Sequence, residues 1–319
     1  MIVRFWGTRG STPVAPTAAA IRRKLVSALV QAAGRDLKTE AAARAFVEGE
    51  LDFAVAGTFG GETSCVQLDG TSDDYVLCDL GSGARRFGLH VLATDGARRA
   101  NTFHVFMSHL HWDHIMGFPF FPPAYIPGNL IRIYGCHDEL EEAFRRQHGA
   151  PSFPVEWSGL RARVEFVHLD PGRAQDVAGL RVTPELQRHA GDSYGYRFEI
   201  DGRTVVYSTD SEHKLDDREE TRAFVAFFRD ADLVIFDSQY SLAAAVTFRA
   251  DWGHSSNIVG VELCQMARAR HLCLYHHEPN LDDAQLAAML RETRRLEEIT
   301  RRDHRMEISA AYDGLELVL

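Results

Sequence analysis

The chain has 319 residues, of which 45% are hydrophobic and 25% charged, and this composition excludes disorder, collagen and coiled coil for the chain as a whole. Lys and Arg total 35 and Asp and Glu total 45, so the net charge is −10. An acidic chain of this size is poorly suited to hold long nucleic acid or an anionic membrane by its overall charge. One number is unusual, because the chain contains 15 histidines.

Short apolar segments that end at turn residues predict strands along most of the chain. Asp201-Gly202 is typical of a two-residue hairpin turn, and a final strand pair is expected to turn at Asp313-Gly314. The other predicted strands are, in chain order, 2–6, 64–68, 75–79, 102–107, 131–134, 163–169, 180–185, 196–200, 204–208, 233–236 and 272–275.

Apolar residues at helical spacing predict a helix over 17–34, with Gly34 as its stop, and Thr39 is a plausible cap for a second helix over 40–48. This pair lies between β-rich segments, so we interpret residues 17–53 as a helical insertion in a single domain of 319 residues. Its apolar stripe must be buried, either over the active site or in a homodimer. The remaining predicted helices are 138–147, 221–228, 256–268 and 283–295.

The cysteines favour a reducing compartment, because their number is odd and their spacing is scattered, without a CxxC pair. The N-terminal segment lacks a basic stretch followed by an apolar one, and no apolar run approaches the ~18 residues of a membrane span. We therefore expect a cytoplasmic protein without disulfides or a membrane partner. The cysteines are Cys65, Cys78, Cys136, Cys264 and Cys273.

The strongest chemical signal is a run of three imidazoles and one carboxylate, directly after the predicted strand 102–107. It consists of His109, His111, Asp113 and His114. A strand end holds such residues rigidly, and His and Asp are the ligands expected for Zn, Mn or Fe. The alternative is a solvated loop that happens to be rich in histidine, and the position after an apolar strand disfavours it.

This segment resembles the HxHxDH signature of the metallo-β-lactamase-fold superfamily. The resemblance extends to residues 58–65, which are similar to the entry of the family's second strand, and to its Asp-x-Gly turn at Asp79. It implies an α/β fold, a four-layer αββα sandwich of two mixed sheets with outer helices. Asp79 would either orient a metal ligand or simply form the turn.

The resemblance also implies two divalent cations, with Zn first and Mn or Fe as alternatives. Three further positions match the family's ligands, and each follows a predicted strand. The implied ligands are His109, His111 and His189 for one metal, Asp113, His114 and His276 for the other, and Asp210 as the bridge.

The segment 251–256 resembles the His-Ser-Thr element of the phosphodiesterase branch, which includes ribonuclease Z and the phosphoribosyl cyclic phosphodiesterases. This implies that His254 contacts the scissile phosphate or assists the leaving group, so the predicted catalytic residues are Asp113 and His254. In the alternative, Ser255 or Ser256 caps a helix and His254 is merely its neighbour.

Other candidate substrate contacts are less specific. His277 lies in an element similar to the family's His-His-Asp-Pro, and it either lines the pocket or is structural. Arg9 either contacts an anion or holds the turn in which it lies. Trp112 and Tyr240 could stack a base, although core packing is the favoured interpretation for both aromatic residues.

Together these residues predict a dinuclear-metal hydrolase, most simply a phosphodiesterase. Two cations about 3.5–4 Å apart can share a water, lower its pKa and stabilise the attacking and leaving oxygens. The predicted reaction is attack of a metal-bridging hydroxide on a small or cyclic phosphodiester. A small anionic substrate is the expected partner, and long nucleic acid is not.

Three alternatives remain open at this stage. The chain could be a ribonuclease Z-like nuclease with the insertion as its arm, although the insertion lacks a basic stripe. It could hydrolyse a lactone or thioester on the same fold. It could also be a metal-dependent sensor rather than an enzyme.

Overall fold

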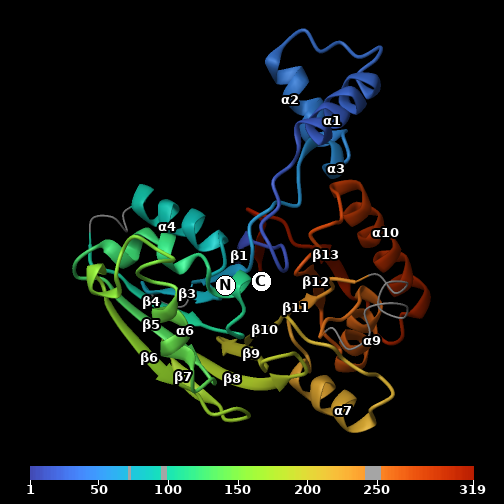
Figure 1. Cartoon of the computed structure of the whole chain (residues 1–319). Coiled ribbons are helices and arrows are strands. Elements are labelled where there is room, and N and C mark those ends of the chain that lie inside the picture. The colour runs from blue at the N-terminus through green and yellow to red at the C-terminus, as the bar shows by residue number, and fades with distance from the viewer. Residues whose placement is uncertain (71–72, 95–98, 241–252) are drawn as a thin grey trace.

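Two mixed β-sheets form the centre of the structure, a computed structural model that describes residues 1–70, 73–94, 99–240 and 253–319. The sheets pack against each other through a shared apolar core, and helices cover their outer faces (Figure 1). The α/β class and the four-layer αββα sandwich expected from the sequence are therefore confirmed.

The first sheet combines a parallel half with an antiparallel half. Its strands are, in spatial order, β14 (Glu316–Val318), β1 (Ile2–Gly7), β2 (Cys65–Asp69), β3 (Tyr75–Cys78), β4 (Thr102–Phe106), β5 (Leu130–Gly135) and β6 (Arg163–His168). The strands from β3 to β6 are parallel, and the pairs β14–β1, β1–β2 and β2–β3 are antiparallel.

The second sheet has the same mixed character. Its strands are, in spatial order, β13 (Glu307–Ala310), β12 (His271–Tyr275), β11 (Leu233–Asp237), β10 (Arg203–Ser208), β9 (Ser193–Ile200), β8 (Leu180–Gln187) and β7 (Gln175–Val177). The strands from β10 to β13 are parallel, and those from β7 to β10 pair in antiparallel fashion.

Large aromatic residues fill the space between the sheets. Phe5 and Phe106 of the first sheet and Tyr207 and Tyr275 of the second belong to one buried cluster. Each sheet also packs against its own helices through one further apolar cluster. Burial on both faces explains the continuously apolar sequences of the central parallel strands.

The outer helices bury one apolar face each. The first sheet is covered by α4 (Gly83–Ala93), α5 (Trp112–Ile115), α6 (Leu140–Arg146) and the 3-10 turns η2 (Phe118–Phe120), η3 (Pro122–Tyr125) and η4 (Trp157–Gly159). The second is covered by α7 (Arg218–Phe227), α9 (Asn257–Ala267) and α10 (Asp283–Thr300). Ser256 caps α9 through the amide of Val259, and Asp282 forms a capping box with Gln285 of α10.

The helical insertion protrudes from the sheets (Figure 1). It comprises α1 (Ala18–Gln31), α2 (Glu40–Gly49) and α3 (Phe53–Ala56). No residue of α1 is buried, and Leu25, Leu29 and Val30 are each more than half exposed. At the base of the insertion, Lys24 pairs with Asp283 at the start of α10. The homodimer that would bury the apolar stripe stays a prediction.

The two predicted turns have different outcomes. Asp201-Gly202 forms the hairpin between β9 and β10, with φ angles of 49° and 74°. Asp313-Gly314 also turns, but β13 pairs with β12 in one sheet and β14 pairs with β1 in the other. The prediction of a final strand pair was therefore wrong, because a local turn signal does not say which sheet edge each strand joins.

Helix α4 and strand β7 were absent from the sequence prediction. Helix α4 buries Ala84, Phe87 and Val91 at helical spacing, so an apolar pattern was present. The glycines at 83 and 88, which are weak helix formers, obscured that pattern.

The cysteines and the membrane prediction can be compared directly with the structure. All five cysteines are buried free thiols, as expected. Among the helices that the structure describes, none combines the length and the apolar character needed to cross a membrane.

His213 is a buried imidazole behind the second sheet. Its ring centroid lies 4.2 Å from that of Phe224, and it stacks at 5.4 Å on Phe236. Within the described residues, neither ring nitrogen has a hydrogen-bond partner. Burial lowers the pKa of His213 to about 3, although the carboxylate of Asp237 opposes this effect.

Acidification is expected to destabilise the protein partly through His213. Its pKa rises from about 3 in the folded state to about 6.5 on unfolding, so the unfolded state binds more protons and stability falls as the pH drops below about 6.5. When the pH falls from 7 to 5, the free energy of unfolding should drop in both proteins. The drop should be about 2 kcal/mol smaller for His213→Phe than for the wild type. Urea denaturation at both pH values measures this difference, and equal losses in the two proteins would contradict it.

Candidate functional site

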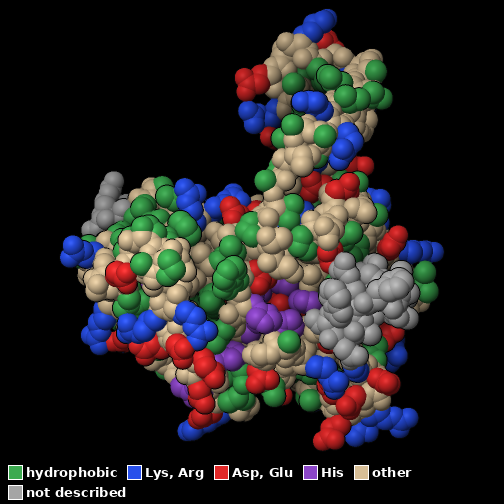
Figure 2. Space-filling view, viewed as in Figure 1, with side chains coloured by type: hydrophobic (Ala, Val, Ile, Leu, Met, Phe, Trp, Pro, Cys, Tyr) green, Lys and Arg blue, Asp and Glu red, His purple; other side chains and the backbone are tan. Residues whose placement is uncertain are grey.

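Histidine and aspartate side chains meet at the ends of strands from both sheets. Asp79 and His109 follow β3 and β4, whereas Asp210 and His276 follow β10 and β12. The carboxyl ends of parallel neighbouring strands lie at one edge of a sheet, which brings together residues far apart in the sequence. Figure 2 shows the histidine side chains gathered between the two halves of the molecule.

Three imidazoles form a first group that could hold a metal ion, namely His109, His111 and His189, whose ligand atoms lie within 4.8 Å of one another. Nδ1 of His111 is 3.2 Å from Nε2 of His189. Nδ1 of His189 donates to the carbonyl of Gly253 at 2.8 Å, which leaves the lone pair on Nε2.

A second group contains two carboxylates and two imidazoles, namely Asp113, His114, Asp210 and His276. Nε2 of His114 lies 3.3 Å from Nε2 of His276, and these atoms are 3.2 and 3.3 Å from Oδ2 of Asp113. The main-chain amide of Ser11 donates to the same Asp113 oxygen at 2.8 Å. The loop after β1 therefore helps to orient Asp113.

The carboxylate of Asp210 faces both groups. Its Oδ2 is 3.6 Å from Nε2 of His109 and 3.8 Å from Nε2 of His189. Its Oδ1 is 3.2 Å from Nε2 of both His114 and His276. Each oxygen thus points toward a different set of donors, which is the arrangement that a bridging carboxylate requires.

Asp79 stands behind this cluster and is fully buried. Its Oδ2 accepts hydrogen bonds of 2.7 Å from Nδ1 of His114, Oγ of Ser108 and the hydroxyl of Tyr207. Its Oδ1 accepts from the amide of Ser108, also at 2.7 Å. Of the two roles considered for Asp79, these contacts favour the one in which it orients His114 so that Nε2 faces the cluster.

The backbone is strained at three of these residues. Asp79, Asp210 and His276 have φ angles of 60°, 48° and 58°, in the left-handed region that non-glycine residues rarely adopt. Such conformations cost on the order of 1–3 kcal/mol each and are common at functional sites.

Gly10 packs against the ring of His276. A Cβ atom at position 10 would lie 2.5 Å from Cε1 of that ring.

The chemistry of the donors fits divalent metal ions. Nε2 of His109 is buried without a hydrogen-bond partner among the residues placed in the structure, as expected of an atom meant for a metal. Burial, and then the neighbouring His114, lower the pKa of His109 well below its usual range, so the ring is neutral. Burial alone would raise the pKa of Asp113, but His114 and His276 lower it, so this group is an anion.

His254 lies outside these two groups, although its ligand atom is also within 4.8 Å of those of His189 and Asp210. Its ring stacks on His276 at 5.2 Å, and its Nδ1 is 2.8 Å from Oδ2 of Asp237. Burial alone would lower the pKa of His254, but Asp237, with the more distant Asp210 and Asp113, raises it to about 9. Sequence reasoning missed Asp237, although it directly follows the apolar predicted strand 233–236 and Asp210 similarly follows the predicted strand 204–208.

Arg9 and His277 contact main-chain carbonyls of neighbouring segments. The Arg9 guanidinium donates to the carbonyls of Gly60, Glu278 and Leu281 at 2.9 to 3.0 Å. Nε2 of His277 donates to the carbonyl of Ala311 at 2.8 Å, and the ring is fully buried. These contacts favour the structural alternatives that the sequence left open for both residues.

The two aromatic candidates differ. Tyr240 is buried, and its ring centroid lies 5.6 Å from that of His254. Trp112, in contrast, is 79% exposed. Core packing was therefore the wrong interpretation for Trp112, because at the start of α5 its indole is turned toward solvent.

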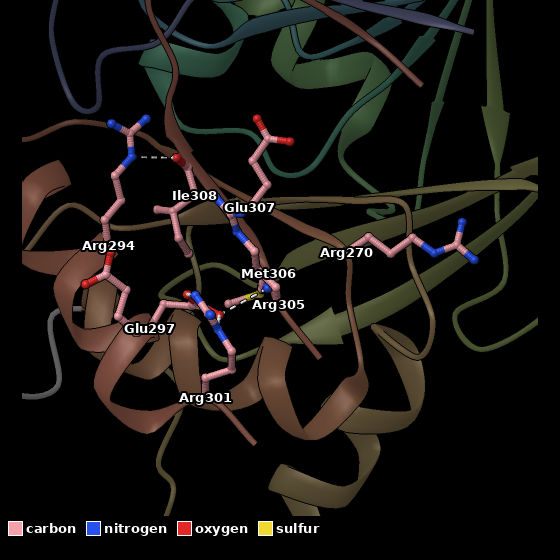
Figure 3. Close-up of a pocket in the computed structure, with 9 residues that line it drawn as sticks. Arg270, Arg294, Glu297, Arg301, Arg305, Met306, Glu307 and Ile308 are labelled. Atoms are coloured by element: carbon pink, nitrogen blue, oxygen red, sulfur yellow. Dashed lines mark hydrogen bonds and ion pairs between the residues drawn. The ribbon is translucent and has the colours of Figure 1, made fainter. Parts of the chain in front are cut away.

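A charged cavity of about 690 Å³ lies apart from the histidines, beside α10 and β13 (Figure 3). Glu297 accepts from Arg301, and Arg294 donates to the carbonyl of Ile308. Arg270 points away from these residues in Figure 3 and pairs with Asp232. Two of the lining arginines, Arg270 and Arg301, are thus paired with carboxylates of the chain, and Arg294 is held by a carbonyl oxygen.

Comparison with known proteins links this geometry to a family. A family model described as a beta-lactamase superfamily domain matches residues 75–277, which is more than half of the chain. Ribonuclease Z of Natronomonas pharaonis is 27% identical over 252 residues, which cover 64% of this chain and 77% of that protein.

Two solved structures share the fold. The metallo-beta-lactamase fold protein YhfI from Bacillus subtilis has a TM-score of 0.65 and 17% identity, with 99% of this chain and 98% of that one covered. A diphosphatase from the PhnP family has a TM-score of 0.60 and 19% identity, with 100% and 97% covered. At these identities the two likenesses support the fold alone.

Replacement of Arg9 should test its structural role. Arg9→Met leaves three carbonyls without their charged donor, so the free energy of unfolding should fall by about 3 kcal/mol. The matched control is Arg86→Met, because Arg86 is partly exposed and forms only a 3.4 Å pair with Asp313. Urea denaturation gives both values. A fully stable Arg9→Met protein with weakened substrate binding would instead support a contact with substrate.

Proposed function

The chain belongs to the beta-lactamase superfamily and is a metal-dependent hydrolase, and we propose that it hydrolyses a small or cyclic phosphodiester with the help of two divalent cations. The resemblance to the phosphodiesterase branch of the metallo-β-lactamase-fold superfamily is confirmed by the family match and the ribonuclease Z relative. The observation that carries the proposal is the pair of donor groups on the two sides of Asp210.

In this proposal each donor group holds one cation, and Asp210 contacts both. Imidazole nitrogens and carboxylate oxygens suit zinc, with manganese or iron as alternatives. The residues assigned to the first cation are His109, His111 and His189, and those assigned to the second are Asp113, His114 and His276.

When bound, two such cations lower the pKa of a water and stabilise the attacking and leaving oxygens of a phosphodiester. The residues of the chain orient the metal-binding rings and supply a proton for the leaving oxygen. Asp79 and Gly253 hold the rings of His114 and His189. Asp237 holds Nδ1 of His254, which leaves Nε2 of that ring to contact the phosphate or to protonate the leaving oxygen.

A small anion is the substrate that the charges favour. The chain carries a net charge of −10, whereas two divalent cations would bring four positive charges to a cluster that contains the carboxylates of Asp113 and Asp210. The attraction is therefore confined to one spot, which suits a compact phosphodiester better than a polymer.

A ribonuclease Z-like activity is the second candidate, and the relative from Natronomonas pharaonis favours it. A nuclease of that type would use the insertion as an arm for transfer RNA. Basic and acidic residues are nearly balanced in residues 17–53, which argues against this use. Transfer RNA that binds the protein at physiological salt would favour the nuclease over the small-substrate enzyme.

Metal content tests the assignment of ligands. Elemental analysis of the purified wild type should give two divalent ions per chain, and Asp210→Ala should retain fewer, because it removes the carboxylate whose two oxygens face the two groups. The control is His254→Gln, which should keep two ions because its Nδ1 contacts Asp237. One ion or none in the metal-loaded wild type would contradict the dinuclear assignment.

Turnover tests the reaction and the role of His254. The metal-loaded wild type should hydrolyse bis-p-nitrophenyl phosphate or a cyclic nucleotide. His254→Gln should lower kcat by about 10²–10⁴-fold with its metal retained, which is the usual contribution of a general acid. Asp113→Ala should lose both activity and metal.

The same assay separates the remaining alternatives. A wild type that leaves phosphodiesters intact but cleaves a lactone or thioester would indicate a different bond on the same fold. A wild type no faster than Asp113→Ala on every substrate class would indicate a sensor.

A further inference from the structure

An apolar cavity of about 520 Å³ is lined in part by the segment that also carries His109, His111, Asp113 and His114. Its lining includes Leu110, Trp112, Ile115, Met116, Phe120 and Phe153. Leu110 and Trp112 are the chain neighbours of His111, and consecutive Cα atoms lie about 3.8 Å apart. One wall of the cavity is thus continuous with the loop that carries the proposed metal ligands.

Two large apolar side chains that line this cavity are exposed to solvent. Trp112 is 79% exposed and Phe120 is 56% exposed. The ring of Phe120 meets that of Phe153 edge-on, with centroids 5.3 Å apart, so an aromatic surface extends across the cavity. Scattered exposed apolar residues need no explanation, but their concentration in one hollow beside a reactive centre marks a binding surface.

The polar side chains at the edge of the cavity contact protein groups. Arg146 pairs with Glu142 one helical turn earlier, and Nε2 of Gln147 donates to the carbonyl of Ile115 at 3.0 Å. Such an environment suits an uncharged, flat group rather than a second phosphate. The volume lies within the range of small-molecule sites.

We propose that this cavity binds a planar aromatic group of the phosphodiester, such as a nucleobase, which stacks on the indole of Trp112 while the phosphate lies at the histidine and aspartate cluster. The proposal rests on the proposed function for the identity of the reacting group. It adds that the enzyme selects substrates by an aromatic substituent next to the phosphate. Stacking on an exposed aromatic ring tolerates different bases, because every base has a flat face.

Binding of two product-like phosphates to the metal-loaded protein tests this proposal without turnover. Calorimetry would compare adenosine 5′-monophosphate with ribose 5-phosphate, which lacks the base. The wild type should bind the nucleotide about tenfold more tightly, as expected for one base stacked on an aromatic ring. In Trp112→Ala the ratio of the two affinities should fall close to one, whereas Trp112→Phe should keep most of it.

Trp112 and Phe120 are exposed, so neither substitution should disturb the core, and Phe120→Ala provides an independent reduction of the same ratio. The control is Ile299→Ala, at an exposed position on α10 outside the cavity, which should leave the ratio at the wild-type value. A wild type that binds both phosphates equally, binds neither, or keeps its ratio in Trp112→Ala overturns the proposal.

Failure of the proposed function would have a different signature. If the wild type prefers the nucleotide but hydrolyses no phosphodiester, the aromatic site stands and the proposed reaction is wrong. If phosphodiesters are hydrolysed but the affinity ratio is one, the reaction stands and the aromatic site is wrong.

Discussion

The buried carboxylate of Asp79 connects the packing of the sheets to the geometry of the site. It lies at the end of β3 and accepts hydrogen bonds from Ser108 of the neighbouring loop, from Tyr207 of the opposite sheet and from His114 of the cluster. A carboxylate taken out of water is costly unless such partners surround it. Because the partners come from both sheets, the charge is satisfied only when the sandwich is fully assembled.

A carboxylate behind an imidazole occurs twice in this site, with different consequences. Asp79 contacts Nδ1 of His114 and turns the other nitrogen toward Asp113 and Asp210. Asp237 contacts Nδ1 of His254. In the proposed mechanism the first ring is a metal ligand and the second donates a proton. The two pairs differ in where the rings lie, since His114 belongs to α5 and His254 precedes α9.

The polar cluster and the apolar cavity share one loop. Residues 109, 111, 113 and 114 supply the cluster, whereas Leu110 and Trp112 line the cavity. This alternation allows a single segment to provide both the charged chemistry and an aromatic surface. The acidic surface of the chain would not prevent an anion from binding there, since the proposed cations concentrate positive charge at the cluster alone.

In the sequence by itself, apolar periodicity indicated most strands and the HxHxDH spacing indicated four candidate ligands, because both are local signals. The fold class and the other three candidate ligands, His189, Asp210 and His276, followed from the resemblance to a family. The sequence did not reveal α4, whose pattern two glycines interrupt, nor that β13 and β14 join different sheets. It also left open which groups Arg9, His277 and Asp79 contact, and it did not identify Asp237 as the partner of His254. Only the tertiary structure decided these points, because burial, hydrogen-bond partners and exposure of a side chain depend on segments that lie far apart along the chain.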